Sequence, residues 1–372
     1  MTGQKYGVGG TAALVVSHCA GMLDLIALPV WVGALVERFG FSPQQAGGLV
    51  TLFLLGAVAA SVVVAPRLNK INQKIAATLG YGAAALAFFA ASTQSGYIEL
   101  AALHLVAGFS VGAALSMVHG AIGKSVNPHR LYALAGISIG LLGIVLLGAL
   151  PQLMIAFGGP MLFRVFGCVM AVACLTCAIF FINPARGEAH GAAPLGRAVW
   201  FTIFGISIMT FNQAMVFSFV EVIGKLRDFP PEGVLGALIA LGVVNFIVPS
   251  PLAAILQKRL AAERVVQIGP AVQALFAVIV TSATAFVLWA PVAAFFVAIQ
   301  IFTHTFAFGL LARLDPTGRA VAATPAMLMI GAALGPIVGG ALGQNFGFGA
   351  LGAAAVLVSV ASTIFFSKAR TA

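Results

Sequence analysis

The first apolar run of the chain, residues 9–36, reads GGTAALVVSHCAGMLDLIALPVWVGALV. It exceeds the about 20 residues that an α-helix needs to cross a bilayer. The whole chain has this character, because 61% of its 372 residues are hydrophobic and only 8% are charged. A soluble domain carries about 25% charged residues. Together with a mean hydropathy of +1.09, these values indicate a protein that crosses a membrane many times.

Windows of about 20 apolar residues predict twelve membrane-spanning helices. They cover residues 9–36, 44–66, 74–94, 97–122, 130–156, 161–183, 198–224, 232–256, 264–288, 290–312, 319–343 and 347–367. The most polar interruption falls between the sixth and seventh segments. We therefore expect an all-α fold with a six-helix bundle over 1–183, a cytoplasmic linker over 184–197 and a second six-helix bundle over 198–372.

The cations indicate the orientation of the chain rather than a nucleic-acid partner. The sequence has 19 Lys and Arg against 9 Asp and Glu, and the cations fall between the apolar segments without forming a dense basic run. With both termini in the cytoplasm, fifteen cations lie on the inner side and four on the outer side, as the positive-inside rule requires. We expect a multi-pass protein of the inner (plasma) membrane, and the first apolar run is too long for the core of a signal peptide.

The two halves of the chain repeat each other at matching places. Residues 66–74 are polar and basic and follow the second segment, as residues 256–264 follow the eighth. Residues 127–130 read Asn-Pro-His-Arg before the fifth segment, and residues 315–319 read Asp-Pro-Thr-Gly-Arg before the eleventh. Repeated halves are typical of transporters that alternate access to a central site.

Three motifs resemble those of the major facilitator superfamily, and the resemblance covers essentially the whole chain. Residues 65–74 match the spacing of its Gly-x-x-x-Asp-Arg-x-Gly-Arg-Lys loop, with Asn69 in place of the Asp. His104 and Gly108 replace its Arg-x-x-x-Gly on the fourth helix. Residues 331–340, GAALGPIVGG, resemble the Gly-x-x-x-Gly-Pro-x-x-Gly-Gly motif of the drug:proton antiporter branch, although that branch carries it on the fifth helix.

The resemblance implies that helices 1, 4, 7 and 10 line a central cavity, and it therefore selects the candidate residues. We expect gating by the helix 2–3 loop, by two histidines toward the ends of helix 4 and by the helix 11 motif: Arg67, Asn69, Lys70, His104, His119, Gly335 and Pro336. We expect substrate contacts from polar and adaptable apolar side chains on helices 1, 7 and 10: Trp31, Phe211, Asn212, Gln213, Met215 and Gln300.

Asp24 is the only carboxylate in the middle third of any predicted segment. A charge near the bilayer centre costs from about 2.5 to more than 10 kcal/mol, so an acid there indicates function. Desolvation disfavours the ionised form, which suits a group that exchanges protons. We predict that Asp24 couples transport to protons, on a stripe with Ser17, Gly21, Leu28 and Trp31. The alternative is a structural Asp bonded to a neighbouring helix.

His304 lies four residues after Gln300 and therefore on the same helix face. It is a second candidate for proton coupling, as a titrating group or a partner for Asp24, with a satisfied interior histidine as the alternative. His18 and Cys19 precede Asp24, but on one continuous helix Asp24 lies about 240° around from His18, which argues against a metal site.

The sequence therefore predicts a proton-coupled secondary transporter, an antiporter that exports small apolar or amphipathic organic compounds by alternating access. It predicts no enzymatic activity and no cofactor, since the energy comes from an ion gradient. Its expected partners are a small-molecule substrate, protons and the lipid bilayer, with no nucleic acid and no metal, and we expect a monomer. The alternatives are an importer or uniporter of a small metabolite, a metal-ion exporter, and a membrane sensor or scaffold that does not transport.

Overall fold

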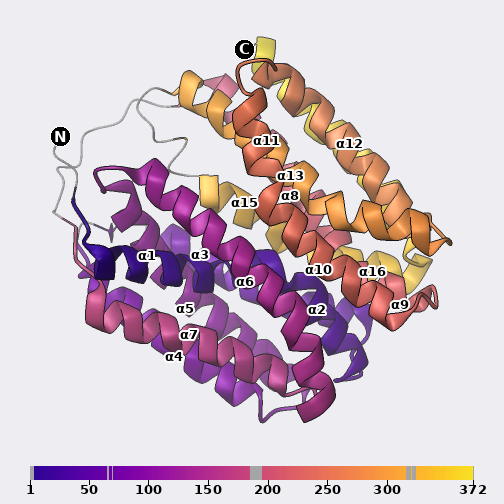
Figure 1. The fold of residues 1–372 in the computed structure, drawn as a ribbon, viewed down its shortest axis with the longest axis horizontal. Helices are drawn as coiled ribbons and strands as arrows, with labels where there is room; N and C mark the ends of the chain where they lie inside the picture. Colours follow the sequence, from indigo (N-terminus) through magenta and orange to yellow (C-terminus); the bar gives the residue numbers. More distant parts are fainter. Residues whose placement is uncertain are drawn as a thin grey trace. The chain divides into compact units, whose positions relative to one another are not determined.

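The computed structural model describes residues 4–64, 67–68, 70–184, 195–315, 320 and 324–371. In chain order its helices are α1 (Val8–Gly21), α2 (Leu23–Glu37), α3 (Pro43–Val64), α4 (Gln73–Ala91), α5 (Tyr97–Gly123), α6 (Pro128–Phe157), α7 (Met161–Phe180), α8 (Arg197–Phe217), α9 (Val220–Leu226), α10 (Pro231–Ile247), α11 (Pro249–Leu256), α12 (Ala262–Ser282), α13 (Phe286–Leu314), α15 (Thr324–Ala333), α16 (Gly335–Phe346) and α17 (Gly349–Thr371). Figure 1 shows them as ribbons coloured along the sequence.

Twelve helical stretches of the described chain are long and apolar enough to cross a membrane. The first runs over Val8–Glu37, the seventh over Arg197–Leu226 and the last over Gly349–Ala369. The predicted all-α fold with twelve membrane helices is therefore confirmed. Length and mean hydropathy sufficed for this, because a backbone in lipid must satisfy its own hydrogen bonds within a helix.

Four of these stretches are interrupted, which hydropathy did not predict. The first is broken at Met22 and the seventh at Ser218 and Phe219. The eighth breaks at Val248, just before Pro249, and the eleventh at Leu334, two residues before Pro336. Each proline lies in the first turn of the new helix, where its missing N–H costs no helical hydrogen bond. The predicted first span is confirmed as the stretch Val8–Glu37, and its one-residue turn at Met22 lies two residues before Asp24.

Contacts divide the chain into two compact units. Unit 1 comprises Met1–Ala27 and Leu52–Gly191, and unit 2 comprises Leu28–Thr51 and Ala192–Ala372. The first interrupted stretch contributes α1 to unit 1 and most of α2 to unit 2. The predicted linker lies almost wholly outside the described residues, so the proposed division at residues 184–197 stays a prediction.

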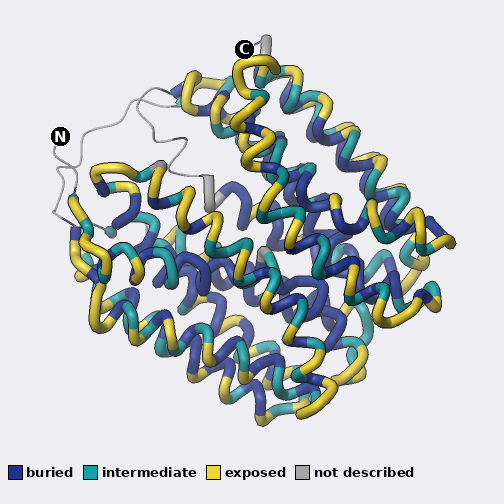
Figure 2. The backbone as a smooth tube through the Cα atoms, viewed as in Figure 1, coloured by how far each residue is buried: buried dark blue, intermediate teal, exposed yellow. Residues whose placement is uncertain are grey.

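Unit 1 is held together by aromatic rings and by close helix contacts. The rings of Phe88 and Phe166 on α4 and α7 lie 5.4 Å apart, and both side chains are buried. A side chain on Gly108 or Gly112 of α5 would collide with backbone atoms of α3. Small residues let helices approach to the backbone in this way. Figure 2 colours the backbone by burial, and dark-blue buried segments alternate with yellow exposed ones along the helices.

Unit 2 has the same construction around α8. This helix packs against α13, α15, α16 and α17, and α12 packs against α13 and α17. Its core includes Ile206, Met209, Phe306 and Phe366, all at most 5% exposed. Unit 2 therefore surrounds the seventh membrane stretch, which carries four of the predicted site residues.

Candidate functional site

Asp24 is the second residue of α2 and is 1% exposed. The break at Met22 places this carboxylate in the first turn of a helix. There the backbone N–H groups and the helix dipole stabilise a negative charge. The first turn of a helix is therefore a more favourable place for a carboxylate than the middle of a helix.

The predicted binding residues Asn212 and Gln300 belong to one buried hydrogen-bond network in unit 2. The Nδ2 group of Asn212 on α8 donates to Oε1 of Gln273 on α12 at 3.2 Å. Gln273 Nε2 in turn donates to Gln300 Oε1 on α13 at 3.0 Å, and Gln300 Nε2 donates to Thr210 Oγ1 at 2.8 Å. The Asn212 amide also reaches Ser359 Oγ on α17 at 3.2 Å. The network connects four helices.

Sequence analysis missed Gln273, which is 0% exposed and lies at the middle of this network. The feature of the sequence that could have identified it is a glutamine in the interior of the ninth apolar segment. Only the fold shows that it bridges the two predicted residues. Asn212 and Gln300, at 0% and 2% exposed, are occupied with other protein groups in this structure. Their amides therefore serve at least as connections between helices.

The other predicted substrate residues differ in how accessible they are. Trp31 and Met215 are fully buried and Gln213 is nearly so. Met215 lies under α16, where its backbone faces Gly335 and Gly339. Only Phe211 is half-buried and retains a larger exposed surface. The apolar walls expected from this helix are largely packed against other helices of unit 2.

His304 stacks on Phe308 within α13, with ring centroids 4.8 Å apart. Its Nδ1 atom is buried and has no hydrogen-bond partner among the described residues. His304 belongs to unit 2, whereas Asp24 belongs to unit 1. A pairing of the two groups stays a prediction.

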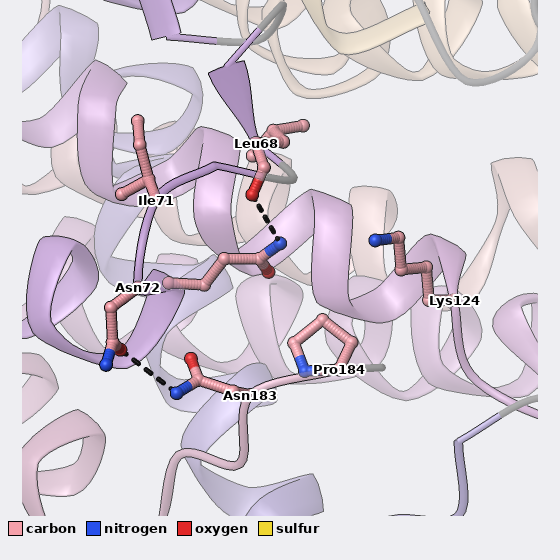
Figure 3. A pocket seen from close by; sticks show the side chains of 7 residues that line it. Leu68, Ile71, Asn72, Lys124, Asn183 and Pro184 are labelled. Carbon is pink, nitrogen blue, oxygen red and sulfur yellow. Dashed lines mark hydrogen bonds between the residues drawn. The ribbon is translucent and has the colours of Figure 1, made fainter. Parts of the chain in front are cut away.

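The loop between the second and third membrane segments, which joins α3 to α4 in the structure, borders a small hollow of about 90 Å³ in unit 1 (Figure 3). Asn183 donates from Nδ2 to Asn72 Oδ1 at 3.0 Å and accepts from the Lys74 backbone N–H at 2.8 Å. Gln73 donates to the Leu68 carbonyl at 3.2 Å. These amide contacts fasten the end of α7 to the start of α4.

The predicted gating residues of this loop take no part in the amide contacts around Asn183 that the structure describes. Arg67 donates to the carbonyl of Val63 one turn earlier, and Lys70 is exposed. Asn69 lies outside the described residues. The charge network that the family motif implies therefore stays a prediction.

The two histidines predicted on the fourth membrane segment, which is α5 in the structure, have different surroundings. His104 is 1% exposed, donates from Nδ1 to the Leu100 carbonyl at 2.7 Å, and meets the Phe163 ring edge-on. It is a core residue of unit 1 in this structure. His119 is partly buried and hydrogen-bonds His18, with 3.0 Å between Nε2 and Nδ1. Sequence analysis had considered His18 only as a metal ligand, and no group of three His, Cys, Asp or Glu in the described chain is arranged to hold a metal.

The glycine-proline motif forms a close helix crossing of unit 2. A Cβ atom on Gly331, Gly335 or Gly339 would lie 2.1–2.6 Å from atoms of α8. A Cβ atom on Gly47 of α3 would lie 2.1 Å from the carbonyl oxygen of Pro336, and the Ile337 N–H donates to Thr51 Oγ1 at 3.2 Å. Gly335 and Pro336 thus mark a point where three helices meet backbone to backbone.

Sequence analysis did not predict the ion-pair chain in unit 2. Lys225 Nζ lies 2.6 Å from Glu221 Oε1 and 2.8 Å from Glu37 Oε2. Glu221 is 5% exposed, and Gly33 leaves the space that its carboxylate fills. These two ion pairs connect the end of α2 to α9. The seventh stretch therefore holds a buried carboxylate whose charge is compensated.

Twelve membrane-length helices with buried acids, amides and backbone-close crossings define a polytopic transport protein of the membrane. A family model described as Major Facilitator Superfamily matches residues 13–316. The chain belongs to the major facilitator superfamily, and the resemblance found in the sequence is confirmed.

Solved structures agree with this assignment at the level of the fold. A crystal structure of the nucleoside transporter NupG (D323A mutant) has a TM-score of 0.73 at 13% identity, with 96% of this chain and 99% of that chain covered. A bacterial homologue of the human lysosomal transporter Spinster, in an inward-facing and occupied conformation, has a TM-score of 0.70 at 13% identity, with 98% and 96% covered. No curated protein matched the sequence.

Proposed function

We propose that this protein is a proton-coupled secondary transporter that exports small apolar or amphipathic organic compounds across the inner membrane, with both termini in the cytoplasm. The observation that carries the proposal is the burial of Asp24, which is 1% exposed inside the first membrane stretch. A carboxylic acid in that position is expensive unless it functions. Protonation removes its charge, so that a conformational change need not move a bare charge through apolar surroundings.

The composition of the helices supports a neutral or monoanionic substrate. Phosphates and dicarboxylates are normally held by Arg or Lys clamps. The first, fourth, seventh and tenth stretches contain three cations, Arg197, Lys225 and Arg313, and all three lie in the outermost turns. No cofactor and no ATP-binding module are required, because the ion gradient drives the cycle.

Uptake of a small polar metabolite is the second candidate. One of the structural neighbours is a nucleoside transporter, and unit 2 holds amide groups suited to hydrogen-bonding a polar ligand, with Asn212 Oδ1 lacking a partner in the described chain. A nucleoside would have to displace the internal bonds of Gln300 to use that network. Nucleosides therefore belong in the compound panel.

The test is reconstitution in liposomes that contain a pH-sensitive dye, with a panel of lipophilic cations, amphipathic weak acids and nucleosides. An inward or outward pH gradient should drive accumulation of at least one compound, with an opposing movement of protons for export. In Asp24→Asn, gradient-driven flux should fall at least about tenfold while substrate counterflow survives, because the neutral side chain mimics only the protonated state.

The matched control is Glu99→Gln, which removes an exposed carboxylate at the start of α5 and should leave flux unchanged. Unchanged gradient-driven flux in Asp24→Asn would remove Asp24 from the coupling mechanism. If no compound moves protons and none raises the melting temperature of the purified protein, the antiporter proposal is refuted.

A further inference from the structure

Two histidines that lie 101 residues apart in the sequence form a hydrogen-bonded pair in unit 1. His18 Nδ1 on α1 and His119 Nε2 on α5 are 3.0 Å apart. Their ring centroids are 5.1 Å apart at an interplanar angle of 42°. Tyr132 on α6 meets both rings edge-on, with centroids 6.2 Å and 5.8 Å away. Three membrane helices therefore converge on one imidazole pair.

The pair uses only half of its hydrogen-bonding capacity. Each neutral imidazole has one N–H donor and one lone pair. The shared bond uses one donor and one acceptor, which leaves His18 Nε2 and His119 Nδ1. In the described chain neither of these nitrogens has a hydrogen-bond partner. A neutral pair thus presents a free N–H at one end and a free lone pair at the other.

The groups around the pair are mostly neutral. Tyr132 faces it from α6, and beside His18 on α1 the Cys19 thiol points to the Ala135 carbonyl at 3.9 Å. Ser17 contacts Cys177 of α7 at 3.0 Å and accepts from the Tyr81 hydroxyl of α4 at 2.6 Å through its backbone carbonyl. No salt bridge joins either ring to a carboxylate within the described residues. Asp24, six residues beyond His18, is the nearest acid along the chain.

We propose that His18 and His119 act as one proton-carrying site, distinct from Asp24. A proton bonds to the free lone pair of one ring and forms an N–H bond there. The proton of the shared hydrogen bond crosses to the other ring, whose outer N–H bond then breaks and releases its proton. One proton enters, one leaves, and the neutral pair remains with its hydrogen bond reversed.

The geometry distinguishes this role from simple helix packing. In the protonated pair the internal bond joins an imidazolium to an imidazole, and such charge-assisted bonds are about twice as strong as neutral ones. This offsets part of the cost of a buried charge. The outer nitrogens make no hydrogen bond within the described chain, so a proton can be exchanged there without breaking a contact to protein. The inference rests on the proposed proton-coupled transport but assigns a site that Asp24 does not supply.

The test measures the protonation of the rings without any substrate. The full chain, labelled with ¹⁵N-histidine and held in lipid nanodiscs, is titrated by NMR between about pH 5 and 8, the range in which histidine changes charge. Variants His18→Gln and His119→Gln assign the two signals among the six histidines. In the intact protein the first protonation should appear as one common step at both rings, because the protonation steps of strongly interacting groups belong to the pair and not to either ring.

In His119→Gln the titration midpoint of the His18 ring should shift by at least about half a pH unit, because the imidazole that hydrogen-bonds the protonated ring has been removed. Tyr132→Phe is the control, since it keeps the ring contact and should keep the common step. The inference is overturned if both rings stay neutral across the range or titrate independently. The intact protein alone decides these two outcomes, so a variant that fails to fold does not remove the test.

This result is separable from that of the liposome experiment. If Asp24→Asn transports normally while the pair titrates in one step, the role of Asp24 fails and the pair stands. If Asp24→Asn loses coupling while the rings never protonate, only the pair is refuted. Where a compound is transported, His119→Gln should change the pH dependence of flux, and Tyr132→Phe should not.

Discussion

Gln273 illustrates how much a single buried side chain contributes to this molecule. It accepts from Asn212 and donates to Gln300, and all three side chains are at most 2% exposed. A buried polar group left without its partner costs about 1–3 kcal/mol, more than the net value of one hydrogen bond. Gln273 therefore stabilises unit 2 by supplying an acceptor to Asn212 Nδ2 and a donor to Gln300 Oε1.

Replacing this side chain should destabilise the protein. Gln273→Leu removes both bonds and leaves Gln300 Oε1 without its donor, so the melting temperature in detergent should fall by several degrees. The matched control is Gln257→Leu, whose side chain is exposed and bonds only to the nearby Ala254 carbonyl. Equal melting temperatures for the two variants, measured by tryptophan fluorescence, would contradict a structural role for the network.

Lys225 compensates a carboxylate that the fold has buried. Removing one partner of a buried ion pair is far more costly than removing an exposed pair, because the other charge stays desolvated. Lys225→Met should therefore lower the melting temperature, and the double variant Lys225→Met with Glu221→Gln should recover part of the loss. Arg313→Met is the comparison, since its 2.8 Å pair with Glu263 is exposed and such pairs contribute about 0–1 kcal/mol. A larger loss in Arg313→Met would refute this account.

At the scale of elements, the α16–α8 crossing depends on the spacing of its glycines. Gly331, Gly335 and Gly339 recur every four residues, which places them on one side of the α15–α16 stretch. Each has backbone atoms of α8 within 3.0 Å of the position that a Cβ atom would take. The motif noticed in the sequence thus has a direct structural reason, namely contact between two backbones.

One added methyl group tests this crossing. Gly335→Ala would place its Cβ 2.6 Å from the Ala214 Cβ and 2.7 Å from the Met215 nitrogen, so α8 and α16 must separate. In a helix, alanine is otherwise favoured over glycine by about 1 kcal/mol. Gly309→Ala on α13, where nothing lies within 4 Å, should keep or raise the melting temperature, whereas Gly335→Ala should lower it. A stabilised Gly335→Ala would exclude close packing as the function of the motif.

At the scale of the whole molecule, twelve crossings and the cation distribution together predict the orientation. An even number of crossings puts both termini on one side of the membrane, and the basic loops favour the cytoplasm. A fluorescent-protein fusion at the C-terminus should therefore fluoresce in cells, and an alkaline phosphatase fusion there should be inactive. The phosphatase fused after Gly158, between α6 and α7, should be active. The opposite pattern would reverse the orientation and with it the direction of the proposed export.

The sequence by itself determined the class of the molecule. Apolar segments about 20 residues long, cations between them and the repeated motifs predicted twelve helices and the superfamily, because a lipid environment permits few backbone arrangements. It also singled out Asp24, since an acid is conspicuous in an apolar run.

Only the tertiary structure decided which polar groups meet. The network around Gln273, the contact of Lys225 with Glu37 and the His18–His119 pair each join side chains from helices that lie far apart in the sequence. The break at Met22 was likewise not predictable from the sequence, because no proline lies at that position. Hydropathy and residue spacing indicate which side of one helix is apolar. Which side chains from different helices form hydrogen bonds or ion pairs depends on how several helices rotate and pack against one another. No local sequence pattern encodes that packing.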